Sequence, residues 1–319
     1  MDEAAAAIGP AMLQGTEELP APVSGQRHEI ASRVGRLTYY SAGPDKDGGF
    51  PPLLLIHTIN AAASAYEVRP LYEHYRRSRT VYALELPGFG HSERGKREYS
   101  VRMMTDAILI MVREIQDVHG RAPIDALAVS LSSEFLARAV TEMPLAFRSV
   151  ALVSPTGFSI VDAKTKWRHG TRAMPRLHAF FEFPAWSKGF FRLLTSRAGI
   201  RFFLKKTWGS SNIDEGLAEY DYLTTHQPGA QHAPYYFVSG YLFSKDMIKI
   251  YHSLTLPVWM THGVRGDFVD YSNKTAVQDR ANWTIQIFPT GAMPHFEAKD
   301  AFIEAYDTFL AGVPAASSA

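Results

Sequence analysis

The stretch Ile124-Asp-Ala-Leu-Ala-Val-Ser-Leu-Ser-Ser-Glu134 decides the fold of this chain. Its first six residues, 124–129, are largely apolar and too few for a helix, which predicts a buried strand. The residues from Glu134 to Val140 are mostly strong helix formers. The strand therefore runs almost directly into a helix, and Ser130 lies at the junction.

Ser130 has a small residue two positions away on each side, Ala128 and Ser132. A sharp strand-to-helix turn needs small residues there, because their side chains face neighbouring backbone, and it forces the central residue into a strained conformation that exposes its side chain. The alternative for this stretch alone is a plain β–α junction with an N-capping serine. We exclude Ser132 as the central residue, because Glu134 would then occupy a small position.

Length and composition narrow the class of protein. The chain has 319 residues, 46% of them hydrophobic and 20% charged, which is ordinary for a soluble globular enzyme. A formal net charge of +1 predicts neither a nucleic-acid partner nor an anionic-membrane partner. The absence of cysteine excludes disulfides, thiolate zinc sites and a cysteine nucleophile.

Apolar runs alternate with helical patterns over most of the chain, which predicts right-handed βαβ units around a mostly parallel sheet. An antiparallel pair at 28–40 precedes them. The segment 158–250 breaks this rhythm and holds 18 of the 39 aromatic residues. The predicted strands are Pro52–Ile56, Thr80–Leu86, Ile124–Val129, Ser149–Val153, Pro257–Thr261 and Trp283–Phe288, and helices are expected at Ala62–Arg77, Ser100–His119, Glu134–Met143, Asn273–Arg280 and Ala298–Leu310.

These patterns predict a core formed by 26–157 and 251–312, interrupted by an aromatic-rich helical segment at 158–250. Residues 1–25 and 313–319 are expected to be disordered tails. The first of these tails contains four acidic and no basic residues, which is unlike a secretory signal or a transit peptide, so we expect a cytoplasmic protein. No apolar stretch approaches the ~18 residues of a membrane span.

The ordered set of features from 28 to 310 resembles the α/β-hydrolase fold superfamily. Ala128 and Ser132 stand where that family usually has glycine, and Glu85-Leu-Pro-Gly-Phe-Gly-His-Ser92 is similar to its Asp-x-Pro-Gly-x-Gly-x-Ser loop. The resemblance implies a mostly parallel sheet flanked by helices, with a helical cap inserted between strands 6 and 7. It also implies that Ser130 is a nucleophile at a strand-to-helix elbow.

The same resemblance implies roles for residues outside the elbow. The triad acid would be Asp267, on the turn after the seventh strand, with Asp270 as the second candidate. The oxyanion hole would consist of the Ile59 and Leu131 backbone N–H groups, although Thr58 replaces the usual glycine in that loop.

The family's last loop commonly reads Gly-His-x-Pro-His-x-Glu, and this chain has Gly291-Ala-Met-Pro-His-Phe-Glu297. Ala292 therefore occupies the position of the usual catalytic histidine, and His295 that of the second histidine. We expect the loop to bring His295 to Ser130 as the general base; otherwise the base is missing. His57 is expected to be structural.

The predicted function is serine hydrolysis of an ester or related acyl bond in a small apolar substrate, by Ser130, His295 and Asp267. Serine at position 130 argues against the epoxide and halide hydrolases of the superfamily, which use aspartate there. The alternative is a non-hydrolytic ligand-binding protein with a degenerate triad. No metal-ligand cluster and no phosphate-binding loop appear in the sequence, so no metal and no cofactor are predicted.

Overall fold

The computed structural model describes residues 18–44, 49–159 and 169–314. Most of the two predicted tails lies outside these ranges. Residues 18–25 are described, and they pack on the core: Leu19 and Val23 are buried, and the Leu19 carbonyl accepts a hydrogen bond from His91 Nε2 (2.7 Å). The predicted disorder therefore does not hold for this part of the chain.

An eight-stranded sheet with the order β1-β2-β4-β3-β5-β6-β7-β8 forms the centre of the molecule. β1 and β2 form an antiparallel hairpin, and β2 pairs antiparallel with β4, whereas the other neighbouring strands are parallel. The prediction of a mostly parallel sheet is thus confirmed. The strands are β1 (Gln26–Ser32), β2 (Gly35–Ala42), β3 (Leu53–Ile56), β4 (Val81–Glu85), β5 (Ile124–Val129), β6 (Phe147–Val153), β7 (Val258–His262) and β8 (Trp283–Ile287).

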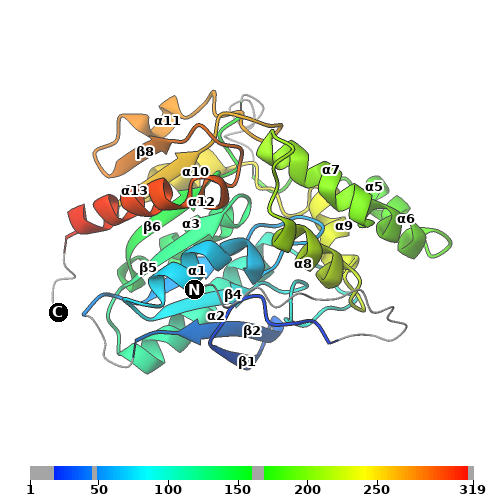
Figure 1. Ribbon diagram of the computed structural model, residues 1–319, viewed down its shortest axis with the longest axis horizontal. Coiled ribbons are helices and arrows are strands. Elements are labelled where there is room, and N and C mark those ends of the chain that lie inside the picture. Colours follow the sequence, from blue (N-terminus) through cyan, green and yellow to red (C-terminus); the bar gives the residue numbers. More distant parts are fainter. Residues whose placement is uncertain (1–17, 45–48, 160–168, 315–319) are drawn as a thin grey trace, which may run out of the picture.

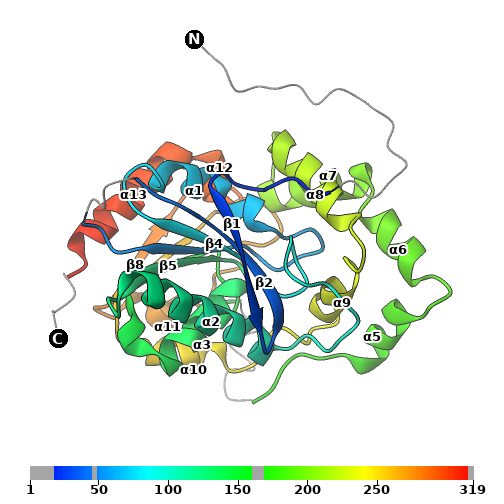
Figure 2. The same ribbon diagram turned by 90° about the horizontal axis from the view of Figure 1, so that it is seen from below.

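Helices cover both faces of the sheet, with α1, α12 and α13 on one face and α2, α3, α10 and α11 on the other (Figures 1 and 2). Outside the segment between β6 and β7, the helices are η1 (Ala65–Val68), α1 (Arg69–Tyr75), α2 (Val101–His119), α3 (Ser132–Glu142), η2 (Pro144–Ala146), α11 (Thr275–Gln278), α12 (Pro294–Glu297) and α13 (Lys299–Gly312). Among the described residues, no helix combines the length and the apolarity that crossing a bilayer requires.

The central strands are apolar throughout because both faces of the sheet are covered. In β3, Leu54 and Ile56 belong to the core on the α2 and α3 side, whereas Leu53 and Leu55 belong to the core on the α1 and α13 side. All four side chains are fully buried. Each such burial stabilises the fold by about 1.5–3 kcal/mol, which fixes the strand that precedes Thr58 and Ile59.

Six described helices lie between β6 and β7 in the sequence: α5 (Pro175–Glu182), α6 (Ser187–Leu194), α7 (Arg197–Trp208), α8 (Glu215–Thr225), α9 (His232–Val238) and α10 (Met247–Ser253). The first five extend beyond one end of the sheet (Figure 1). Both ends of this inserted segment bind the buried Glu134 carboxylate, which accepts from Thr156 Oγ1 (2.5 Å) and from the Ser244 N–H (3.0 Å). Burial raises the pKa of Glu134 to about 7.

Candidate functional site

Ser130 lies at a sharp turn between β5 and α3. Its φ is 55°, in the left-handed region that residues other than glycine rarely adopt, and its N–H donates to the Val153 carbonyl (2.7 Å). Ala128 and Ser132 are fully buried, as expected for the outer positions of the turn. The strain holds the half-buried Ser130 side chain at the carboxyl edge of the sheet, beside the N-terminus of α3.

Ser130 lines a cavity of about 290 Å³, which we call the Ser130 cavity. The elbow, the loop after β6, the inserted segment, the loop after β7 and Ala292 all contribute to its walls. Its aromatic lining residues are Phe158, Phe237, Phe243, Phe268 and Tyr271. A cavity with these apolar walls and a few polar groups is suited to a small, largely apolar ligand.

Ala292 occupies the wall of this cavity at the position where the resembled family has its catalytic histidine. Its backbone is fixed on both sides, because its N–H donates to the Thr207 carbonyl (2.9 Å) and its carbonyl accepts from Ser154 Oγ (2.7 Å). The side chain is a methyl group and cannot accept a proton. Ser130 therefore has no base at this position.

His295 lies in the core, and the structure does not bring it to Ser130. Its side chain is fully buried in α12, and its Nε2 donates to the Glu67 carbonyl (2.7 Å). Its Nδ1 has no partner among the described residues, and its ring packs against Phe296 and Phe302. Burial lowers the pKa of His295 to about 4, so the ring is neutral near pH 7. His295 is not among the residues that line the Ser130 cavity.

Both candidate acids, Asp267 and Asp270, line the Ser130 cavity, but each has another partner. The Asp267 carboxylate is half-exposed and pairs with Lys206 Nζ (2.6 Å). Asp270 Oδ1 accepts from the Ser272 N–H (3.1 Å) and from Ser272 Oγ (2.7 Å), as in a turn cap. Among the described residues, no hydrogen bond joins either carboxylate to His295.

The two predicted oxyanion donors differ in position. Leu131 lines the Ser130 cavity, and its N–H donates to no other group of the described chain. Ile59 is buried and does not line the cavity. The loop before Ile59 is fixed by the Glu67 carboxylate, which accepts from the Thr58 N–H (2.8 Å) and hydroxyl (2.9 Å). Of this pair, Leu131 is thus the residue that lines the cavity.

Two other histidines near the carboxyl edge of the sheet also form hydrogen bonds through their ring nitrogens. His57 Nε2 accepts from the Leu86 N–H (3.0 Å) and its Nδ1 donates to the Thr58 carbonyl (2.6 Å), which fits its predicted structural role. His262, which no sequence motif indicated, ends β7 and stacks on Tyr271 with ring centroids 4.0 Å apart. Its position directly after an apolar strand was the available signal. Burial lowers the pKa of His262, and its Nδ1 donates to the Gly263 carbonyl (2.7 Å).

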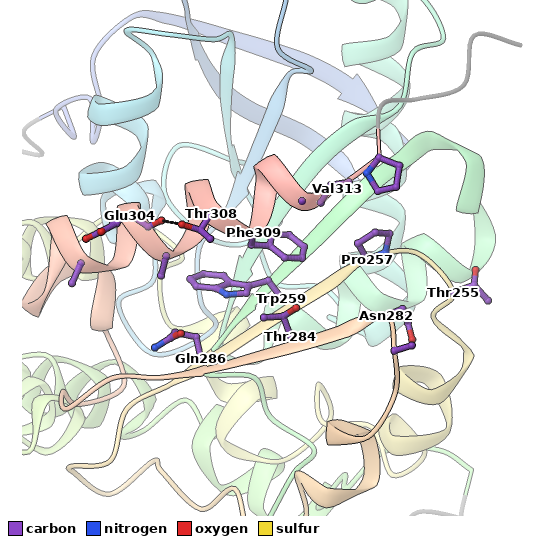
Figure 3. A pocket seen from close by; sticks show the side chains of 15 residues that line it. Thr255, Pro257, Trp259, Asn282, Thr284, Gln286, Glu304, Thr308, Phe309 and Val313 are labelled. Carbon is purple, nitrogen blue, oxygen red and sulfur yellow. Dashed lines mark hydrogen bonds between the residues drawn. The ribbon is translucent and has the colours of Figure 1, made fainter.

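A larger cavity, of about 900 Å³, lies between β7, β8 and α13 (Figure 3). Trp259, Thr284 and Phe309 are among its lining residues, and none of the predicted site residues lines it. Because Pro257 and Trp259 are at the amino end of β7, this cavity is remote from the carboxyl edge that carries Ser130. We therefore take the smaller Ser130 cavity as the candidate site. Within the described ranges, no group of three or more His, Asp or Glu residues could hold a metal ion.

Comparison with known proteins agrees with this architecture. The sequence model of the α/β-hydrolase fold family matches residues 51–193. No curated protein sequence matches the chain significantly.

Solved structures with the same fold include three bacterial hydrolases. The chain is similar to 2-hydroxy-6-oxo-6-phenylhexa-2,4-dienoate hydrolase from a Rhodococcus species, at 15% identity over 91% of this chain and 100% of that one, with a TM-score of 0.68. The enol-lactonase from Burkholderia xenovorans is 15% identical over 89% of this chain and 100% of that one, with a TM-score of 0.65. The carboxylesterase from Bacillus subtilis is 15% identical over 91% of this chain and 93% of that one, with a TM-score of 0.64. At such identities the likeness extends to the fold alone.

Proposed function

We propose that this chain, which has the α/β-hydrolase fold, binds a small, largely apolar acyl compound in the Ser130 cavity without hydrolysing it. The observation that carries this proposal is the methyl group of Ala292 on the cavity wall, with His295 hydrogen-bonded to Glu67 in the core. General-base catalysis needs a base within roughly 2.6–3.2 Å of the reacting hydroxyl, or one water away. No histidine lines the Ser130 cavity among the described residues.

The walls of the cavity support an acyl ligand in particular. Its aromatic rings favour an apolar body, and its volume of about 290 Å³ suits a small one. The Ser130 hydroxyl and the Leu131 N–H are hydrogen-bond donors at the N-terminus of α3, where partial positive charge favours an acceptor oxygen. A carbonyl or carboxylate oxygen at that end would satisfy both donors.

The inserted segment, 158–250, is the proposed source of selectivity. It contributes Arg172, Phe237 and Phe243 to the cavity, and the last two rings pack together with centroids 5.4 Å apart. The loops at the sheet edge would hold the acyl oxygen, whereas the inserted segment would contact the apolar body of the ligand. This division would make the segment a helical cap over the site.

Calorimetric titration with phenylacetate and a turnover assay with p-nitrophenyl acetate test the proposal together. We expect saturable phenylacetate binding. The Phe243→Ala variant should bind phenylacetate about ten-fold more weakly, because the apolar contact with one ring is lost. The control Phe50→Ala, at an exposed position, should bind it like the wild type. We expect no ester turnover above that of the Ser130→Ala variant. Turnover that Ser130→Ala abolishes would overturn the non-hydrolytic part of the proposal.

That outcome would favour the second candidate, hydrolysis of an ester or related acyl bond with Ser130 as the nucleophile. The observation in its favour is the strained φ of 55° at Ser130, which is typical of a nucleophile elbow. In this hypothesis Ser130 attacks the carbonyl carbon, Leu131 and Ile59 stabilise the oxyanion, and Asp267 orients His295 as the base. His295 would have to leave its hydrogen bond to Glu67. Fluorophosphonate labelling that is lost in Ser130→Ala would support it.

A further inference from the structure

The near-zero net charge of the chain conceals an uneven distribution. Residues 172–206 contain eight of the 33 Lys and Arg residues and one of the 32 Asp and Glu residues, a local excess of +7. The rest of the chain therefore has 25 basic and 31 acidic residues, and is net acidic by −6. The segment 172–206 contains α5, α6 and most of α7.

Only part of this positive charge is neutralised by neighbouring acids. Arg197 pairs with Glu219, Arg201 with Glu215, and Lys206 with Asp267. Residues 176–206 contain seven of these basic residues, and setting the three partner acids and Glu182 against them still leaves an excess of +3. Within the described part of the chain, the basic residues of 172–206 that form no ion pair include Arg176, Lys188, Arg192 and Lys205.

These three helices and the turn between α5 and α6 expose large apolar side chains. We call this surface the rim patch; its side chains are between 41% (Trp186) and 70% (Leu193) exposed, and they are Phe180, Phe183, Trp186, Leu193, Phe202 and Phe203. The Trp186 ring lies 4.4 Å from Phe183 and 5.3 Å from Phe180, between centroids, so the three rings form one exposed aromatic cluster. α5 and α6 lie at the end of the molecule farthest from α13, and α7 runs from α6 back towards the core (Figures 1 and 2).

α6 and α7 do not depend on the exposed rings for their packing on the rest of the protein. That contact is made by other residues: Phe191 of α6, and Ile200 and Trp208 of α7, are buried. Soluble monomeric proteins rarely expose a large apolar cluster, such as that of Phe180, Phe183 and Trp186, unless it contacts a partner. The rim patch is therefore distinct from the buried residues through which α6 and α7 pack on the rest of the protein.

We propose that the rim patch docks on the surface of an anionic lipid bilayer. Surface-bound helices combine Trp, Phe and Leu, which enter the boundary between headgroups and acyl chains, with Lys and Arg, which attract anionic headgroups. The rim patch has both components on adjacent helices. A second copy of the chain fits less well, because a two-fold contact would bring the excess charge of one segment against the same charge of the other. This inference does not depend on the proposed acyl ligand.

Co-sedimentation of the full chain with vesicles of phosphatidylcholine alone, or of phosphatidylcholine with phosphatidylglycerol, tests the docking. We expect binding to the anionic vesicles that high salt weakens, because salt screens the electrostatic attraction. Addition of anionic vesicles should shift the tryptophan emission to the blue, and the shift should be lost in Trp186→Phe. Binding that is equally strong on neutral vesicles in high salt would overturn the electrostatic part of the proposal.

Paired variants separate the two components of the patch. Lys188→Glu with Arg192→Glu should weaken vesicle binding by at least about 25-fold, at about five-fold for each cation removed near an anionic surface. Arg113→Glu with Arg121→Glu, both exposed outside the patch, is the matched charge control and should bind like the wild type. Phe183→Ser with Trp186→Ser should also release the protein, whereas Val118→Ser with Leu145→Ser should not.

Circular dichroism and a thermal midpoint for each variant verify that it is folded. The proposal fails if the folded patch variants bind anionic vesicles as the wild type does, or if the wild type does not bind them. It also fails in favour of a second copy if sedimentation equilibrium detects a dimer that Phe183→Ser with Trp186→Ser dissociates while no vesicle binding is seen.

Discussion

Replacing Ala292 by histidine would put an imidazole on the wall of the Ser130 cavity, beside the elbow and the two acids of the loop after β7. If the scaffold lacks only the base, the Ala292→His variant should hydrolyse p-nitrophenyl acetate about 10²–10⁴ times faster than wild type, the usual contribution of a positioned general base. Ala292 is 8% exposed, so the larger side chain must enter the cavity, and we expect overpacking to cost about 1–3 kcal/mol of stability.

The gained rate should rise with pH through one group near ~6.5, because only the neutral imidazole accepts the Ser130 proton. Ser130→Ala in the same background should abolish it, and Asp267→Asn should lower it more than Asp270→Asn. Ala292→Gln is the matched control, since it adds bulk without a base. Equal activity of Ala292→His and Ala292→Gln, or a gain that survives Ser130→Ala, would refute the idea that the missing base is what separates this chain from a hydrolase.

Four further predictions concern stability. His295→Ala should leave phenylacetate binding unchanged. It should lower the free energy of unfolding, measured by chemical denaturation, by about 1–3 kcal/mol or more, because the buried Glu67 carbonyl loses its hydrogen-bond donor. A variant that is as stable as the wild type but binds phenylacetate more weakly would contradict this. His295 has its pKa lowered from 6.5 to about 4 by burial, so its contribution to stability is lost as the pH falls from about 6.5 towards 4, and His295→Ala should flatten that acid branch. Burial raises the pKa of Glu134 from 4.5 to about 7, so the folded state binds a proton that the unfolded state has released, and the free energy of unfolding of the wild type should fall as the pH rises through this range. The Glu134→Gln variant should lose less stability between pH 5 and 8. If urea titrations gave the same dependence of stability on pH for both proteins, this role would be excluded. Ser130→Gly should be more stable than Ser130→Ala, because glycine adopts a φ of 55° without strain, and the difference should appear as a higher thermal midpoint.

The sheet was predictable because its signals are local. β3 and β5 are short apolar runs whose side chains are buried on both faces, and this pattern is visible without knowing their neighbours. Helix bounds were less predictable: the helix expected at 62–77 is the short η1 followed by α1 at Arg69–Tyr75, with Pro70 in its first turn. Local signals thus indicated the order of the elements better than their ends.

The site was predictable in part for the same reason. The conformation of Ser130 follows from its immediate neighbours, so the sequence indicated its backbone strain. The orientation of His295 depends instead on a hydrogen bond to Glu67, 228 residues earlier in the chain. Asp267 likewise pairs with Lys206 of α7, which no spacing near residue 267 could indicate. Contacts between segments so distant in sequence become visible only in the folded chain.

The Glu134 carboxylate has a consequence for how this fold can vary. One oxygen binds Thr156 and the other binds Ser244, so the points where the inserted segment leaves and rejoins the core are held a few ångströms apart by a single side chain. Closing a loop between two neighbouring points costs little more for a long loop than for a short one, about 0.6 kcal/mol for each doubling of its length. We therefore expect the segment between these residues to tolerate changes in length while the register of β5, β6 and β7 stays intact.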